Sequence, residues 1–274
     1  MQYIKVRFTN ISSDESDMLI AMLSDIGFNG FEEGENELLA YTDEDVYNSS
    51  ELESVAAAIG CTYEIETLTH QNWNALWESN FQPVVVDNIC TIRAHFHDIE
   101  VSTPYEIVIT PKMSFGTGHH ATTQLVIMQM MGLDFKKKSI LDFGTGTGVL
   151  AIFAEMLGAE TILAIDNDEW SVENAIENAA RNNCRRITVL KASMEDIPAG
   201  KNDIILANIN RHILLQHMAD MYERLADGGL IVMSGLLAAD RDIIVEGAGS
   251  AGFRLISEGS IDNWIALLFD KIQK

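Results

Sequence analysis

The sequence predicts an α/β protein in which a Rossmann-like sheet of seven strands, the last antiparallel, follows a small α+β N-terminal domain. Three observations predict this class. From residue 139 onward, apolar runs alternate with segments of helical period, a pattern that requires right-handed crossovers onto a parallel sheet. A glycine-rich turn at 144–148 follows the first of these runs. The last two runs, 253–260 and 263–270, are joined by a tight polar link around Gly259 and Ser260, so the final strand must return antiparallel.

Residues 1–67 have the pattern of an α+β domain. Period-two alternation indicates strands, and Ser/Asp starts with glycine stops bound the two segments of helical period. The expected elements are a strand over 2–8, a helix over 12–27, two short strands within 28–42, a helix over 50–60 and a strand over 61–69.

Residues 68–83 are expected to form a linker helix. Trp73, Trp77 and Phe81 recur every four residues and therefore share one helical face. We expect this aromatic stripe to pack against a neighbouring domain, because large exposed apolar patches are rare on proteins.

The second domain is predicted to span residues 84–274. It opens with two strands between residues 84 and 110, and a glycine-containing loop then leads into a helix that ends near residue 132. The elements that follow are strands over 139–143, 161–166, 187–192, 203–208 and 228–235, and helices over 148–158, 170–183, 211–226 and 238–252.

The composition narrows the range of partners. The chain has 18 Lys and Arg residues against 41 Asp and Glu, a formal charge of -23, so direct binding to nucleic acid is not expected and a basic partner is favoured. The three cysteines are far apart, which predicts neither a zinc site nor a disulfide framework and suits a reducing compartment. No segment approaches the ~20 apolar residues that span a bilayer, so we expect a cytoplasmic protein that does not bind membranes.

The glycine turn is the main candidate for a ligand site. Gly144, Gly146 and Gly148 follow a strand with the spacing G-x-G-x-G, where the backbone turns tightly and a ligand can approach closely. A dinucleotide fingerprint requires a small residue where Val149 stands, and no Gly-Lys-Ser/Thr follows for a phosphate loop. A cationic sulfonium nucleoside suits an acidic crevice better, and Asp166 at the next strand end can accept ribose hydroxyls.

Four motifs together resemble one family. By analogy, the glycine turn resembles the S-adenosylmethionine-binding motif of seven-stranded methyltransferases, whose antiparallel last strand is inserted in the sheet. The segments FGTGHHATT, LDFGTGTGVLAI, AIDNDEWSVENAIENAARN and LANINRHILL are similar, in sequence and order, to the ribosomal protein L11 methyltransferases. The N-terminal domain is similar in size and position to the substrate-recognition domain of that family.

The resemblance implies roles for particular residues. It implies that Thr123, Gly144, Asp166 and Asn208 contact S-adenosylmethionine, and Gly146 of the same turn is expected to do so too. It also implies transfer of methyl groups to lysine side chains and the N-terminal amine of ribosomal protein L11. The expected protein is a monomer without a metal site. An alternative is a methyltransferase that acts on an amino group of another protein or of a nucleic acid.

Several polar and aromatic residues near these motifs have expected roles in chemistry or in structure. We expect Asn208 to accept hydrogens of the substrate amine as the catalytic residue, and Asn210 to cap the following helix. Asp142 is expected to hold backbone N–H groups of the glycine turn. Trp264 on the last strand belongs either to the core or to a substrate-facing wall.

Overall fold

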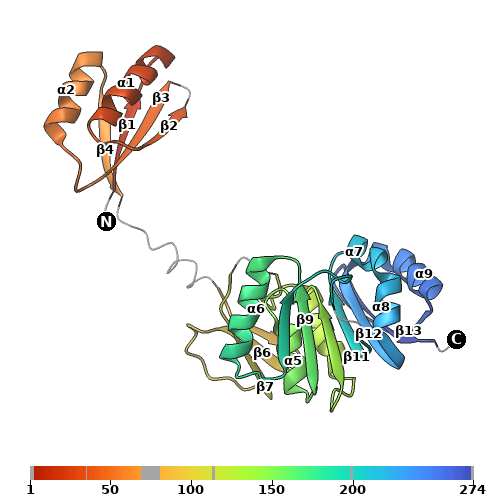
Figure 1. Cartoon of the computed structure of the whole chain (residues 1–274). Coiled ribbons are helices and arrows are strands. Elements are labelled where there is room, and N and C mark those ends of the chain that lie inside the picture. Colours follow the sequence, from red (N-terminus) through yellow and green to blue (C-terminus); the bar gives the residue numbers. More distant parts are fainter. Residues whose placement is uncertain (1–2, 35, 69–80, 113–114, 198–199, 273–274) are drawn as a thin grey trace. The chain divides into compact units, whose positions relative to one another are not determined.

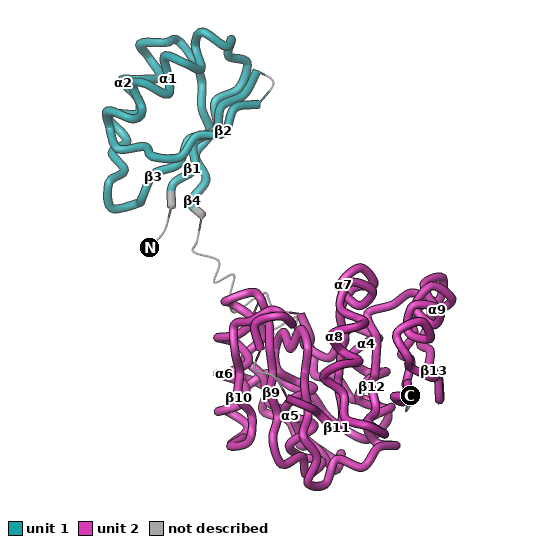
Figure 2. Tube along the Cα trace, turned by 45° about the vertical axis from the view of Figure 1, so that its right-hand side comes forward, with its two compact units in different colours: residues 1–80 teal, residues 81–274 magenta. Residues whose placement is uncertain are grey.

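A computed structural model describes residues 3–34, 36–68, 81–112, 115–197 and 200–272. The chain divides into two compact units, Met1–Asn80 and Phe81–Lys274 (Figure 2). The predicted linker helix over 68–83, with Trp73 and Trp77, falls almost entirely within residues 69–80 and so lies outside the described residues.

The N-terminal unit is a four-stranded antiparallel sheet with two helices on one side (Figure 1). Its sheet order is β2-β3-β1-β4, and side chains of β1 and β3 form one core with those of the helices. A capping box between Ser12 and Glu15 starts the first helix, and Gly60, with φ of 80°, ends the second. The predicted elements are confirmed as β1 (Tyr3–Thr9), α1 (Ser13–Asp25), β2 (Gly30–Gly34), β3 (Glu37–Asp43), α2 (Ser49–Ile59) and β4 (Tyr63–Leu68).

The larger unit contains the predicted seven-stranded sheet. Its strands are β8 (Ser139–Phe143), β9 (Thr161–Asp166), β10 (Ile187–Lys191), β11 (Asn202–Asn208), β12 (Leu225–Leu237), β13 (Phe253–Ile261) and β14 (Trp264–Lys271). Its helices are α4 (Ala121–Met130), α5 (Val149–Met156), α6 (Glu169–Arg181), α7 (Arg211–Gln216), α8 (Met218–Arg224) and α9 (Arg241–Ala251), with a short 3-10 turn η1 (Ala238–Asp240) before α9.

The sheet is buried on both faces. Along β11, Ile204 and Leu206 join the core under α4 and α5, whereas Ile205 and Ala207 join the core under α7, α8 and α9. This arrangement explains why β11 is a continuous apolar run, since a parallel strand covered by helices on both sides has no solvent face.

The strand order confirms the predicted class. It runs β10-β9-β8-β11-β12-β14-β13, with β14 antiparallel to both of its neighbours and the other strands parallel to one another. The link before β14 lies at Asp262 and Asn263, whereas the predicted link residues Gly259 and Ser260 belong to β13. Asp262 has φ of 51°, which Asp tolerates in tight turns, so the hairpin extends further than its glycine suggested.

The structure differs from the sequence prediction in three elements. Between residues 84 and 110 there are three short strands, not two: β5 (Val84–Val86), β6 (Cys90–Ala94) and β7 (Tyr105–Ile109) form a separate small sheet. The predicted helix over 211–226 is broken at His217, which is the C-cap of α7 and the N-cap of α8 and whose backbone angles, φ of -102° and ψ of 15°, are not helical. The strand β12 begins at Leu225, three residues before the predicted start of this strand at residue 228, because Leu225 pairs with Asn202.

Asparagines of α6 occupy the open edge of β7. Asn182 donates to the carbonyl of Val108 at 2.7 Å and accepts from its N–H at 2.9 Å. One turn earlier, Asn178 accepts from the N–H of Thr110 at 2.8 Å, and Asn174 donates to its carbonyl at 3.0 Å. The three amides therefore hydrogen-bond to β7 and its extension as a neighbouring strand would, because residues i, i+4 and i+8 share one helical face.

Asn178→Ala should destabilise the protein by about 2–4 kcal/mol, because it leaves the partly buried N–H of Thr110 and the buried carbonyl of Thr147 without partners. Urea unfolding measures the loss. Glu173→Ala, an exposed position on the same helix, is the control and should change the free energy of unfolding by less than about 0.5 kcal/mol. Equal stabilities of the two variants would contradict the proposed strand-like role.

Candidate active site

A cavity of about 720 Å³ lies at the carboxyl ends of β8, β9 and β11. The strand order reverses between β8 and β11, and in open α/β sheets ligands bind at such a point. The volume falls within the range of small-molecule sites. All five predicted site residues line the cavity: Thr123, Gly144, Gly146, Asp166 and Asn208.

The glycine turn folds back onto the end of β9. The N–H groups of Gly144 and Thr145 both donate to the carbonyl of Ile165, at 2.9 and 3.0 Å. Gly144 and Gly146 have φ of 75° and 54°, a region that side chains disfavour. A Cβ at Gly144 would lie 2.2 Å from Ile209 Cγ2, so the turn has no room for a larger residue.

Asp166 holds the turn from the other side. Its Oδ2 accepts from the N–H of Gly146 at 3.0 Å, and its Oδ1 accepts from the N–H of Asp168 at 3.0 Å. Each carboxylate oxygen has two lone pairs, so capacity for further donors remains. The expected contact with ribose stays a prediction.

Asp142 lies buried beneath the turn. Its Oδ2 accepts the hydroxyl of Thr145 at 2.5 Å, whereas no described group donates to its buried Oδ1. The expectation that it holds backbone N–H groups of the turn is wrong, because those groups donate to Ile165, Asp166 and Phe115 and within the turn itself. Burial raises the pKa of Asp142 to about 7, the charge of Asp166 adds to the rise, and the Thr145 hydroxyl opposes it.

Asn208 lines the cavity and has a buried side-chain oxygen without a described donor. Its Nδ2 lies 3.5 Å from Thr123 Oγ1, at the long limit of a hydrogen bond, and no described group donates to its buried Oδ1. A buried acceptor without a partner is costly, and four other described oxygens share this property, those of Asp43, Gln129, Asp142 and Asn174. Asn208 differs from these four because it lines the cavity. The expected cap is confirmed, because Asn210 Oδ1 accepts from the N–H of Ile213 at 3.2 Å and starts α7.

Two histidines also line the cavity: His217, which no sequence pattern indicated, and His120, which the sequence left open as a proton acceptor beside the cofactor or a residue that shapes the loop. His217 is buried between α7 and α8, its ring contacts Phe143 edge-on at 5.6 Å, and its Nδ1 lies 3.0 Å from Asp220 Oδ2. His120 caps α4, and its ring contacts the half-buried Trp264 at 4.5 Å. Trp264 lines the cavity, so of its two readings the structure favours the wall.

Two negative findings apply only to the described residues. Among them, no three His, Cys, Asp or Glu side chains group closely enough to hold a metal ion. None of the helices in this part of the chain combines the length and apolar character that a bilayer crossing needs.

Asp142 should give the stability a measurable pH dependence. Its carboxyl ionises near 3.8 in the unfolded chain and near 7 in the folded one, so between these values only the folded chain keeps the proton. The free energy of unfolding therefore falls as pH rises through this window, by up to about 1.4 kcal/mol per pH unit. Asp142→Asn removes this titration.

From pH 5 to pH 7, the unfolding free energy of the wild type relative to Asp142→Asn should fall by about 2 kcal/mol in urea titrations. Asp242→Asn is the control, since the Asp242 side chain is 96% exposed, and its profile should follow the wild type. A constant difference between wild type and Asp142→Asn across this range would show that Asp142 does not titrate there.

Comparisons with known proteins identify relatives of this chain. The family model of ribosomal protein L11 methyltransferase (PrmA) matches residues 14–272. A ribosomal protein L11 methyltransferase of Phocaeicola vulgatus is 38% identical over 278 residues, covering 98% of this chain and 99% of the relative. One of Porphyromonas gingivalis is 39% identical over 262 residues, covering 92% and 90%.

The solved structures include a similar protein. The ribosomal protein L11 methylase of Lactobacillus delbrueckii subsp. bulgaricus aligns with a TM-score of 0.66 and 28% identity, covering 70% of this chain and all of that one. The fold, the cavity at the strand ends and these matches lead to one conclusion: the chain belongs to the ribosomal protein L11 methyltransferase family.

Proposed function

We propose that this S-adenosylmethionine-dependent methyltransferase acts on amino groups of ribosomal protein L11, both lysine side chains and the N-terminal amine. Family membership supports the substrate, because the relatives are named for it. The observation that carries the chemistry is the buried Oδ1 of Asn208, an acceptor without a described donor on the wall of a glycine-lined cavity. An amine hydrogen is the donor that this oxygen lacks.

The residues of the cavity fit S-adenosylmethionine. Gly144 and Gly146 leave the backbone open where a side chain would fill the space, and Asp166 and Asp168 contribute negative charge. No lysine or arginine is among the described lining residues, so nothing repels a sulfonium cation. The bound nucleoside supplies an electrophilic methyl carbon, and transfer forms a nitrogen–carbon bond, breaks the sulfur–carbon bond and leaves a neutral thioether.

Each predicted residue has a task in this proposal. The backbone at Gly144 and Gly146 would contact the amino-acid part of the donor, and the free lone pairs of Asp166 would accept the ribose hydroxyls. The hydroxyl of Thr123 lies beside Asn208 and orients its amide. These groups come from four separate segments, which the sheet holds in fixed positions.

The amine must lose its proton before it can attack. A lysine amine with a pKa near 10.4 is about 99.9% protonated at pH 7.4, so the neutral form costs roughly 4 kcal/mol. A partly dry cavity lowers this cost by disfavouring the charge. Asn208 Oδ1 then accepts a hydrogen of the neutral amine and aims its lone pair at the methyl carbon.

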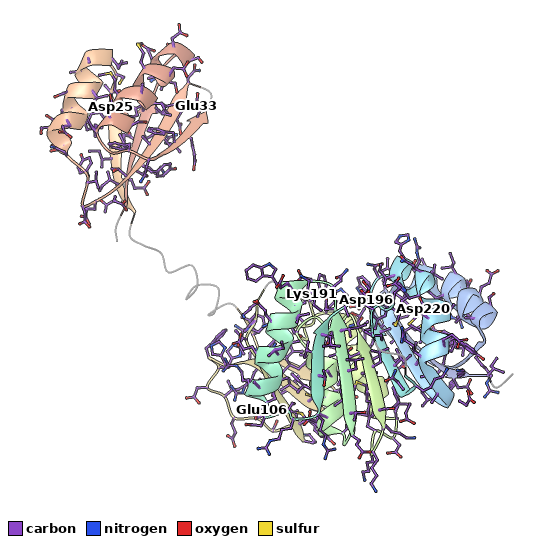
Figure 3. All side chains as sticks on the ribbon, in the orientation of Figure 1. Asp25, Glu33, Glu106, Lys191, Asp196 and Asp220 are labelled. Carbon is purple, nitrogen blue, oxygen red and sulfur yellow. The ribbon has the colours of Figure 1, made fainter. Side chains whose placement is uncertain are left out.

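The N-terminal unit has the charge that a basic substrate requires. Residues 1–80 contain 16 Asp and Glu against two basic residues, a net formal charge of -14 (2 − 16). Both basic residues are paired, Lys5 with Glu66 and Arg7 with Glu37. Exposed carboxylates such as Asp25 and Glu33 project from its surface (Figure 3). We propose that this unit, with the linker, presents the ribosomal protein, and that a cytoplasmic monomer suffices because one chain supplies the cavity.

Asn208→Ala should slow single-turnover methylation of ribosomal protein L11 by about 100-fold, because the amine loses its orienting acceptor. The affinity for S-adenosylmethionine should fall by less than about 10-fold, measured by calorimetry. Asn210→Ser, which keeps a capping side chain on α7, is the control and should retain wild-type rates. Unchanged rate and affinity in Asn208→Ala would rule out the assigned role.

Deletion of residues 1–65 should leave the binding of S-adenosylmethionine intact, because all described cavity residues lie between Phe115 and Trp264 and the two units have separate cores. Methylation of intact ribosomal protein L11 should be lost. Calorimetry and transfer of labelled methyl groups measure the two effects. If the shortened protein still methylates the intact substrate at the wild-type rate, the N-terminal unit does not present it.

A further inference from the structure

Three aromatic side chains form one wall of the cavity: Phe115, His120 and Trp264. The rings of Phe115 and His120 have centroids 6.3 Å apart and are tilted by 64°, and those of His120 and Trp264 are 4.5 Å apart and tilted by 69°. We call this set the aromatic wall. Because neighbouring rings are steeply tilted, each pair brings the edge of one ring toward the other.

The aromatic wall adjoins the place where the amine would react. Its member His120 caps α4, and Thr123, one turn further along α4, contacts Asn208. The backbone of its member Phe115 contacts the glycine turn, since the Phe115 carbonyl accepts the N–H of Thr147 at 2.9 Å and lies where a Cβ of Gly146 would be. The wall therefore extends from the glycine turn to the neighbourhood of Asn208.

The strand register places Trp264 on the same edge of the sheet. Asn208 pairs with Ser234 of β12, and Leu237, three residues further along β12, pairs with Trp264 of β14. The backbone that carries the indole is thus held by β12 and β13, and the indole contacts His120, the N-cap of α4.

The chemistry of this wall favours a methylated ammonium group. The faces of aromatic rings attract cations, and no lysine or arginine is among the described residues of the cavity. Each added methyl group removes one N–H donor from the nitrogen and adds apolar surface. Contacts with ring faces survive this change, whereas hydrogen bonds to a polar wall would be lost.

We propose that Phe115, His120 and Trp264 hold the partly methylated ammonium group of the substrate, so that the same nitrogen receives further methyl groups. This rests on the proposed function, because it requires an amine substrate. Each transfer produces a methylated ammonium, which the rings retain by their attraction for cations. Loss of its proton to solvent then frees the lone pair, and the neutral methylamine stays against the rings through its apolar methyl groups, beside Asn208, for the next transfer. The wall determines how many methyl groups a nitrogen receives.

The test compares variants of the full-length protein. Phe115→Ala removes a ring that is 82% exposed and so contributes little to packing, and Trp264→Leu removes the indole, whereas Trp264→Phe keeps an aromatic ring. Trp170→Ala is the matched control, since Trp170 is 74% exposed and lies outside the residues that line the cavity. Mass spectrometry of ribosomal protein L11 gives the methylation state of each nitrogen at equal total methyl transfer.

Phe115→Ala and Trp264→Leu should lower the ratio of multiply to singly methylated nitrogens by about 3- to 10-fold, the range expected for one lost cation–ring contact. Trp264→Phe should restore most of the ratio, and Trp170→Ala should change neither the ratio nor the affinity for S-adenosylmethionine. An unchanged ratio in both Phe115→Ala and Trp264→Leu overturns the proposal, as does an equal shift in Trp170→Ala.

A second measurement does not depend on the ribosomal protein. If the wild type binds S-adenosylmethionine but methylates no nitrogen of ribosomal protein L11, the proposed function fails, and the wall is then tested with tetramethylammonium chloride. Saturation-transfer NMR on the enzyme with S-adenosylhomocysteine should show contact with this cation, which Phe115→Ala and Trp264→Leu weaken and Trp170→Ala keeps. Absence of contact in the wild type overturns the proposal.

Discussion

The carbonyl of Ile165 and the carboxylate of Asp166 are the acceptors on which the site depends. Three N–H groups of the turn after β8, those of Gly144, Thr145 and Gly146, donate to these two residues at the end of β9. The turn is therefore fixed by the neighbouring strand and not by its own sequence alone. Because the glycines adopt positive φ, the backbone can reach these acceptors and still leave the cavity open.

The same turn is held from its far side by α6. Asn178 joins the carbonyl of Thr147 to the N–H of Thr110, so hydrogen bonds run without a break from β9 through the glycine turn to the extension of β7. Buried networks of this kind are rigid when every member is satisfied. Three buried oxygens in or beside this network have no described donor: Asn174 Oδ1 on α6, Asp142 Oδ1 under the turn and Oδ1 of Asn208, a cavity-lining residue.

Local patterns predicted most of the fold. Apolar periodicity, capping residues and glycine stops are all signals within one short segment of sequence. The observed bounds of β8, α5 and β9 lie close to those that these signals predict. The hairpin of β5 and β6 was missed because a strand of three residues is too short to show a period, and its turn at Asp87 and Asn88 has positive φ without glycine.

The site could be predicted only in part. Glycine spacing and an acidic residue at a strand end are visible in one segment, and they led to Gly144, Gly146 and Asp166, whereas Thr123 and Asn208 came from the family resemblance. All five line the cavity, and their contacts with S-adenosylmethionine stay predictions. The contact of His120 with Trp264 joins positions 144 residues apart (264 − 120), and no local pattern encodes it. The asparagines of α6 were read only as helix residues, because their partners lie more than 60 positions away.

The insertion of β14 between β12 and β13 has a consequence for biosynthesis. Until Trp264–Lys271 has been translated, β12 has an unpaired edge, and β13, although made earlier, has no strand beside it. Lys271 then fastens β14 by donating to the carbonyls of Tyr222 and Leu225 at 2.9 and 2.7 Å. Closure of the sheet and arrival of the indole therefore coincide, and a nascent chain that stops before this strand lacks a finished sheet as well as one wall of its cavity.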